Sequence, residues 1–265
     1  MSAIEVERAT LSVGGKTILN EVTLAVDEGE FIGVLGSNGA GKTTLMRAVL
    51  GLLPASCGAI RVFGKTVTRG NAAIGYLPQT RAATASLRLC GRDVLAASID
   101  GHRWGAPLVS NAGQKEIDRC LDLVGAGHLA SRPITELSGG ERQRLFIAQA
   151  LIGGPKILLL DEPLASLDPH QQRVVVDLVH DLSRRLGLTV LFSAHELNQV
   201  VGAVDRILYL GQRQAAIGPV DTVIQPAILS RLYGAPIDVV RANGHIFVMS
   251  GGAVVERDQH HDHDH

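Results

Sequence analysis

The stretch "GSNGAGKTT", residues 36–44, decides the fold of this 265-residue chain. It matches the pattern G-x-x-x-x-G-K-[ST], and it follows "FIGVL" (31–35), an apolar run of strand length. In that setting the glycines let backbone N–H groups turn toward phosphate oxygens, and the start of the next helix adds partial positive charge. The pattern therefore predicts a phosphate-binding loop between a strand and a helix. The alternative is a glycine-rich turn that matches by chance.

Two side chains of this loop have distinct expected roles. Lys42 is expected to reach the β and γ phosphates of a nucleotide, and the Thr43 hydroxyl is expected to bind Mg²⁺. Backbone N–H groups supply the other phosphate contacts. The predicted nucleotide-binding residues are Gly36, Ser37, Asn38, Gly39, Ala40, Gly41, Lys42, Thr43 and Thr44.

The composition argues against several classes of protein. A formal net charge of −1 and an aromatic content of 3% lack the basic excess and the stacking side chains of nucleic-acid binders, so no nucleic-acid partner is expected. Cys57, Cys90 and Cys120 lie far apart without a C-x-x-C pair, which favours neither a disulfide framework nor a zinc ribbon. The longest strongly apolar runs are too short to cross a bilayer. Any work at a membrane is therefore expected to depend on a partner.

The hydrophobic pattern changes along the chain. Alternation of apolar and polar residues in "IEVERATLSV" (4–13) and "EVTLAV" (21–26) predicts short antiparallel strands. Between about residues 80 and 150, apolar residues three and four apart, such as Ile117, Leu121 and Val124, predict helices. Strands and helices then alternate, which predicts a parallel sheet covered by helices.

These patterns together predict an α/β fold. Its parts are a P-loop NTPase core with a parallel sheet, an N-terminal antiparallel β subdomain, and an α-helical subdomain inserted at about 80–150. This nucleotide-binding domain is expected to span 1–225. A C-terminal appendage is expected at 226–257, with a hairpin turning at Asn243–Gly244, and a His/Asp-rich tail at 258–265.

The segment "KILLLDEP" (156–163) supplies a pair of acids. An apolar strand that ends in Asp161 brings a carboxylate to the edge of the sheet where α/β proteins bind ligands, and this carboxylate is expected to hold Mg²⁺. Glu162, the next residue, is placed to polarise an attacking water. A strand that ends in two solvated acids is the alternative.

The segment "ELSGGERQR" (136–144) reads first as a capping box, in which Ser138 caps a helix and Glu141 reaches back to it. A capping box does not explain the successive glycines Gly139 and Gly140, which expose backbone N–H groups. At this point the sequence resembles the ATP-binding subunits of ABC transporters, whose signature is LSGGQ. Glu141 stands in the last place of that signature.

The resemblance extends to three further positions. Gln79, in "GYLPQT" (75–80), matches the glutamine that contacts Mg²⁺ and the attacking water and couples to the transmembrane partner. Asp168, in "SLD" (166–168), matches the D-loop, and His195, in "LFSAHE" (191–196), matches the histidine that contacts the γ-phosphate. Without the resemblance, His195 would be a structural histidine and Gln79 an ordinary loop residue. The resemblance implies catalytic roles for Glu162, His195 and Gln79, and Mg²⁺ contacts from Thr43, Gln79 and Asp161.

The resemblance also implies partners. In ABC proteins two nucleotide-binding domains pair head to tail, so Ser138, Gly139, Gly140 and Glu141 would close the ATP site of a second copy in a homodimer. The implied cofactors are ATP and Mg²⁺. The implied location is the cytoplasmic face of the inner membrane, bound to integral-membrane permease subunits. One departure is that the family usually has an adenine-stacking aromatic where Val13 stands, which leaves base selectivity open.

Two features indicate what is transported. The segments "LNQVVGAVDRILYLGQRQAAIGP" (197–219) and "LYGAPIDVV" (232–240) resemble the zinc and manganese uptake branch of these ATPases. The chain ends in "HHDHDH", whose histidines suit transition metals; a solvated end and a tag remnant are the alternatives. The candidate tail ligands are His260, His261, His263 and His265.

We therefore predict an ATPase that powers import of a divalent metal ion, with zinc as the first choice, assisted indirectly by an extracytoplasmic metal-binding protein. A transporter for manganese, iron or a non-metal shares every ATPase motif and stays open. A non-transport ABC ATPase and a small-molecule kinase are the remaining candidate classes. The kinase would have no need of the "LSGGE" segment.

Overall fold

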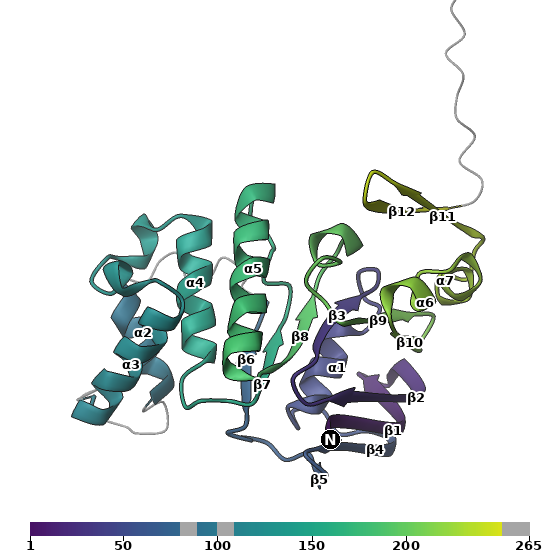
Figure 1. The fold of residues 1–265 in the computed structure, drawn as a ribbon. Helices are drawn as coiled ribbons and strands as arrows, with labels where there is room; N and C mark the ends of the chain where they lie inside the picture. Colours follow the sequence, from purple (N-terminus) through teal and green to yellow (C-terminus); the bar gives the residue numbers. More distant parts are fainter. Residues whose placement is uncertain (80–88, 100–108, 251–265) are drawn as a thin grey trace, which may run out of the picture.

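A computed structural model describes residues 1–79, 89–99 and 109–250 (Figure 1). The predicted tail ligands at 260–265 lie outside these ranges. The central element is a six-stranded sheet in the order β10-β9-β3-β8-β7-β6, parallel except for β10. Its strands are β3 (Phe31–Leu35), β6 (Ile74–Leu77), β7 (Ile157–Leu160), β8 (Thr189–Ser193), β9 (Arg206–Gly211) and β10 (Gln214–Gly218).

The N-terminal part forms a separate antiparallel sheet in the order β2-β1-β4-β5. Its first two strands each span 12 residues, so β1 extends the strand predicted at 4–13 by two residues and β2 is twice as long as the strand predicted at 21–26. The register between them shifts at several points, and Arg8 and Glu21 have left-handed φ angles of 44° and 48°. Bulges of this kind let a long strand bend over a core without ending. The strands are β1 (Ser2–Val13), β2 (Lys16–Asp27), β4 (Cys57–Val62) and β5 (Lys65–Thr66).

The parallel sheet separates two hydrophobic cores. In β7, Ile157 and Leu159 pack into the core shared with helix α1 (Lys42–Val49) and the antiparallel sheet. Leu158 and Leu160 face the other core, which is built with the remaining helices. Successive side chains of a strand point to opposite faces, so a strand buried on both faces needs an unbroken apolar run. This arrangement confirms the predicted parallel sheet with helices packed on it.

Four helices cover the second face of the sheet and extend beyond it. Ile117, Leu121 and Val124, whose spacing predicted a helix, are all buried there. The end of α4 contacts β6 closely, since a Cβ on Gly75 would lie 2.1 Å from the carbonyl oxygen of Ala150. The helices are α2 (Gly91–Ile99), α3 (Asn111–Leu123), α4 (Gly139–Ala150) and α5 (Pro169–Leu186).

The C-terminal part consists of short helices and a hairpin on the side of β9 and β10 (Figure 1). The hairpin turns at Asn243 and Gly244, both with positive φ, as the Asn-Gly pair predicted. The boundary near residue 226 stays a prediction. The elements are α6 (Val220–Val223), α7 (Pro226–Tyr233), β11 (Ile237–Ala242) and β12 (His245–Ser250).

None of the helices in the described ranges combines the length and the apolar character needed to span a membrane.

Candidate functional site

The site lies where neighbouring parallel strands end. Strands β3, β8, β7 and β6 are adjacent in the sheet, so the segments that follow them meet at one edge. The phosphate-binding loop follows β3, and His195 follows β8. Asp161 and Glu162 follow β7, and Gln79 follows β6. The sheet order thus brings together residues that are up to 159 positions apart in the sequence.

The loop before α1 has the backbone that a phosphate cradle needs. Gly36 and Gly41 have φ angles of 142° and 109°, which side-chain-bearing residues rarely adopt. A Cβ on Gly36 would also lie 2.4 Å from the carbonyl oxygen of Leu210 on β9. Only glycine therefore fits at position 36. Gly36 and Gly41 are needed for the backbone conformation of the loop, besides allowing its N–H groups to approach phosphate.

Lys42 begins α1 and is 5% exposed. Its Nζ donates a hydrogen bond to the carbonyl oxygen of Gly36 at 2.8 Å and lies 3.8 Å from Oε1 of Glu162. Burial lowers the pKa of Lys42, and the negative charges of Glu162 and Asp161 oppose that shift. A buried cation of this kind is stabilised by nearby anions, which suits a phosphate group.

Asp161 is 1% exposed and its carboxylate is held from two sides. Ser193 Oγ donates to Oδ1 at 3.1 Å, and the Tyr76 hydroxyl donates to Oδ2 at 3.5 Å. Burial, with the neighbouring Asp161 charge, raises the pKa of Tyr76 to about 12, so this hydroxyl remains a proton donor at neutral pH. The carboxylate is therefore oriented before any ligand reaches it.

Glu162 is the point where the side chains of the site meet. His195 Nε2 lies 2.9 Å from its Oε2, and the Gln79 side-chain amide donates to the same oxygen. Its backbone has a left-handed φ of 51°, an unfavourable conformation for a residue with a side chain. The Glu162 N–H donates to Ser193 Oγ at 2.7 Å, which helps to hold this conformation.

Ser193 is the residue that sequence reasoning missed. It is fully buried at the end of β8, where its hydroxyl accepts a hydrogen bond from Glu162 and donates one to Asp161. The signal in the sequence was a polar residue directly after the apolar run "VLF" of the strand "TVLFS" (189–193). A buried polar side chain needs a partner, but the sequence does not reveal that β7 is the neighbouring strand.

The site fits Mg²⁺ bound together with a nucleotide. The predicted ligands are Thr43, Asp161 and Gln79, which offer the hard oxygen donors that Mg²⁺ prefers. Within residues 1–79, 89–99 and 109–250, no cluster of three or more His, Cys, Asp and Glu side chains could hold a metal ion by itself.

The "LSGGE" segment lies elsewhere. Ser138 caps α4 by accepting from the Glu141 N–H at 3.2 Å, and Glu141 Oε2 accepts from the Ser138 N–H at 2.8 Å, so the predicted capping box is confirmed. The hydrogen bonds from Ser138 lower the pKa of Glu141. Figure 1 shows α4 separated from α1, with α5 between them. The helix that Ser138 caps therefore lies apart from the helix that follows the phosphate-binding loop.

Asp168 lies beside this second segment. It caps α5 by accepting from the Gln171 N–H at 2.9 Å. A Cβ on Gly139 would lie 2.9 Å from Cδ2 of Leu167, so the residue before Asp168 packs directly against the "LSGGE" glycines. Val13, which stands where the family usually has an aromatic residue, ends β1 and is 47% exposed.

Fold and site together define a P-loop nucleoside triphosphatase. Residues 19–165, more than half of the chain, match the sequence model of the ABC transporter family. The chain belongs to the ABC transporter family.

Similar proteins extend this result over most of the chain. It is 34% identical to the manganese transport system ATP-binding protein MntB of Bacillus subtilis, over 92% of this chain and 99% of that protein. It is 36% identical to the zinc import ATP-binding protein ZnuC of Paramagnetospirillum magneticum, over 88% of this chain and 83% of that protein. It also superimposes on a metal-chelate type ABC transporter solved in an inward-facing conformation, with a TM-score of 0.78, 27% identity, and coverage of 94% and 96%.

Glu162→Gln should retain ATP binding and lose turnover. The substitution removes the negative charge that can orient water while Lys42 and the glycine loop remain in place. We expect phosphate release to fall about 100-fold or more, in line with the loss of a general base. Phosphate release and nucleotide affinity should be measured on the same preparation.

Glu196→Gln is the matched control. This exposed carboxylate follows His195 directly, and it makes no side-chain capping bond to the short helix that it precedes. Its turnover should equal that of the wild type. Equal losses of turnover in both variants would contradict the proposed role of Glu162 in orienting water.

Proposed function

We propose that this chain hydrolyses ATP to power the import of a divalent metal ion, with zinc as the first choice. The observation that carries the ATPase proposal is the meeting of Lys42, Gln79 and His195 at the Glu162 carboxylate. This arrangement joins a phosphate-binding cation to a water-orienting acid, as phosphoryl transfer requires.

Each residue contributes a distinct step. The glycine loop and Lys42 bind the phosphates, and Asp161 with Thr43 and Gln79 would hold Mg²⁺. Bound there, Mg²⁺ would neutralise the charge that develops on the phosphate oxygens. Glu162 orients a water for attack in line with the leaving group. His195, 2.9 Å from Glu162, would contact the terminal phosphate beside the same water.

We further propose that the working form is a homodimer. Ser138, Gly139, Gly140 and Glu141 lie on α4, apart from the loop before α1, so they would complete the ATP site of a second copy. Asp168 follows Leu167, which packs against Gly139, and would lie at the same interface. In a head-to-tail pair each ATP touches both subunits, which couples nucleotide binding to closure.

ATP-binding subunits of ABC import systems work with permease subunits in the membrane. For this chain we propose a peripheral position on the cytoplasmic face, against such a permease. Gln79, which matches the glutamine that couples to the transmembrane partner in this family, would face that permease. An extracytoplasmic metal-binding protein would deliver the ion to the other side.

Two lines support a metal cargo. The relatives named for manganese and for zinc cover most of this chain, and their identities of 34% and 36% are too close to choose between the ions. The imidazoles at 260–265 favour zinc, since nitrogen ligands suit Zn²⁺ better than Mn²⁺. Iron or a non-metal substrate would leave the ATPase site unchanged.

The shared-site proposal predicts recovery of activity on mixing two inactive variants. Lys42→Ala removes the phosphate-binding cation, and Ser138→Arg blocks the face that would close on the partner. In a mixed dimer one site carries both changes and the other carries neither. Random mixing should therefore restore about a quarter of wild-type activity, because about half of the dimers are mixed and each has one intact site.

The measurement is phosphate release by each variant alone and after co-expression with two different affinity tags. Mixed dimers isolated through both tags should be active, whereas each pure variant should not. Inactive mixed dimers would contradict the proposal that the sites are shared.

The metal proposal predicts an uptake defect. In a strain from which this chain is deleted, accumulation of radioactive zinc at nanomolar supply should fall, and the wild-type chain should restore it. The Glu162→Gln chain is the matched control, since it should assemble without powering transport. Loss of manganese uptake alone would reassign the ion, and normal uptake of both ions would contradict metal import.

A further inference from the structure

The side chain of Asn198 joins the C-terminal hairpin to the segment that carries His195. Asn198 lies in the short 3-10 helix Leu197–Gln199, three residues after His195. Its Nδ2 donates to the carbonyl oxygen of Ile246 at 2.9 Å, and its Oδ1 accepts from the N–H of Ile246 at 2.9 Å. A single amide thus pairs with both backbone groups of one residue, as a neighbouring strand would.

This pairing occurs at an open edge of the hairpin. Strand β12 pairs with β11 and with no other strand among the described residues, so its second edge offers backbone groups to other partners. Asn198 occupies that edge at Ile246, whose side chain is 9% exposed and belongs to the main core. The bidentate contact therefore fixes the hairpin at the point where it reaches the core.

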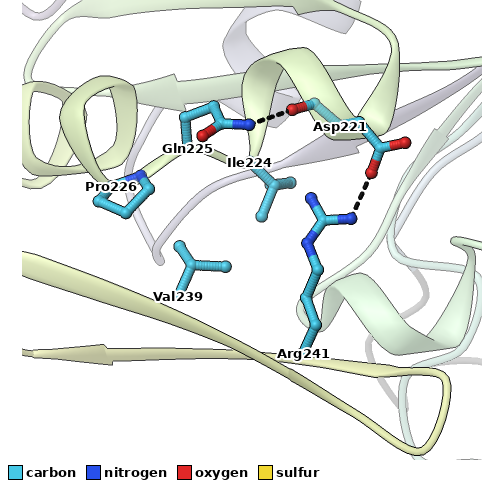
Figure 2. Close-up of a pocket in the computed structure, with 6 residues that line it drawn as sticks. All are labelled: Asp221, Ile224, Gln225, Pro226, Val239 and Arg241. Atoms are coloured by element: carbon cyan, nitrogen blue, oxygen red, sulfur yellow. Dashed lines mark hydrogen bonds and ion pairs between the residues drawn. The ribbon is translucent and has the colours of Figure 1, made fainter.

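The other attachments of the hairpin leave space beneath it. The Ile237 N–H donates to Ser230 Oγ at 2.9 Å, and Arg241 pairs with Asp221. Figure 2 shows Val239 and Arg241 facing α6 and the start of α7 across a pocket of about 480 Å³. Because this space is not filled by side chains, packing alone constrains the hairpin less than a solid core would.

The segment between β8 and Asn198 is short and anchored at both ends. Ser193 is locked by its bonds to Asp161 and Glu162, and Leu197 is 8% exposed in the core. His195 lies between these anchors with a side chain that is 44% exposed. Its imidazole is therefore placed against Glu162 by the two ends of the segment rather than by burial of its own ring.

We propose that Asn198 is a positioning residue for His195, and that the position of the C-terminal hairpin affects the rate of ATP hydrolysis through Asn198. A contact that displaces β12 would shift the 3-10 helix and, with it, the distance from His195 to Glu162. The inference rests on the proposed role of His195 in hydrolysis.

The test compares Asn198→Ala with Gln199→Ala in the full chain. Gln199 is the matched control, since it lies in the same 3-10 helix but its side chain bonds Gln172 on α5 and not the hairpin. In Asn198→Ala, kcat should fall about tenfold, as expected when a catalytic group is slightly misplaced. The KM for ATP should stay within about twofold, because the phosphate-binding loop is untouched.

Amide hydrogen exchange supplies the structural measurement. The N–H of Ile246 should exchange faster in Asn198→Ala and as in the wild type in Gln199→Ala, and kcat should fall only in the first variant. An equal loss of kcat in both variants, or wild-type protection of Ile246 in Asn198→Ala, would overturn the inference.

His195→Ala, measured alongside, separates this inference from the proposed function. Full turnover by His195→Ala would remove the proposed catalytic role of that histidine, and the inference with it. Loss of turnover in His195→Ala, together with wild-type kcat in Asn198→Ala despite a released Ile246 amide, would overturn only the role of Asn198.

Discussion

The hydrogen bonds of the Ser193 hydroxyl connect the parts of this site. This group, fully buried at the end of β8, joins the two acids at the end of β7 by accepting from the Glu162 N–H and donating to Asp161. Glu162 keeps its left-handed backbone in part through this bond, and from that position its carboxylate reaches Lys42, Gln79 and His195. The chemistry proposed for the site therefore depends on one contact between adjacent strand ends.

Local signals in the sequence were enough to predict the motifs and most of the elements. The glycine loop was predicted from its turn residues. The strand before Asp161 and the helix that contains Ile117 and Leu121 were predicted from the pattern of their apolar residues. Ser193 and Asn198 could not be found this way, because their roles depend on partners 31 and 48 residues away. The length of β2 was also missed, since a bulge near Glu21 interrupts the alternation that marks a strand.

The "LSGGE" segment has a role in the fold beside the role in a shared ATP site that we propose for it. A Cβ on Gly139 would require the Leu167 side chain to shift, and Ser138 and Asp168 each cap a helix. This packing and these helix caps lie within one chain and do not require a dimer. These local contacts do not explain why α4 lies apart from α1, and the proposed homodimer, in which a second copy completes the site, would account for it.

The most direct test of this account is the steady-state turnover of Ser193→Ala as a function of Mg²⁺ concentration. Without the hydroxyl, Asp161 keeps only its bond from Tyr76, and the Glu162 N–H loses its acceptor. The account predicts a fall of about tenfold or more in kcat, a higher Mg²⁺ requirement, and normal folding by circular dichroism. Wild-type turnover with a wild-type Mg²⁺ requirement would contradict the claim that this contact organises the site.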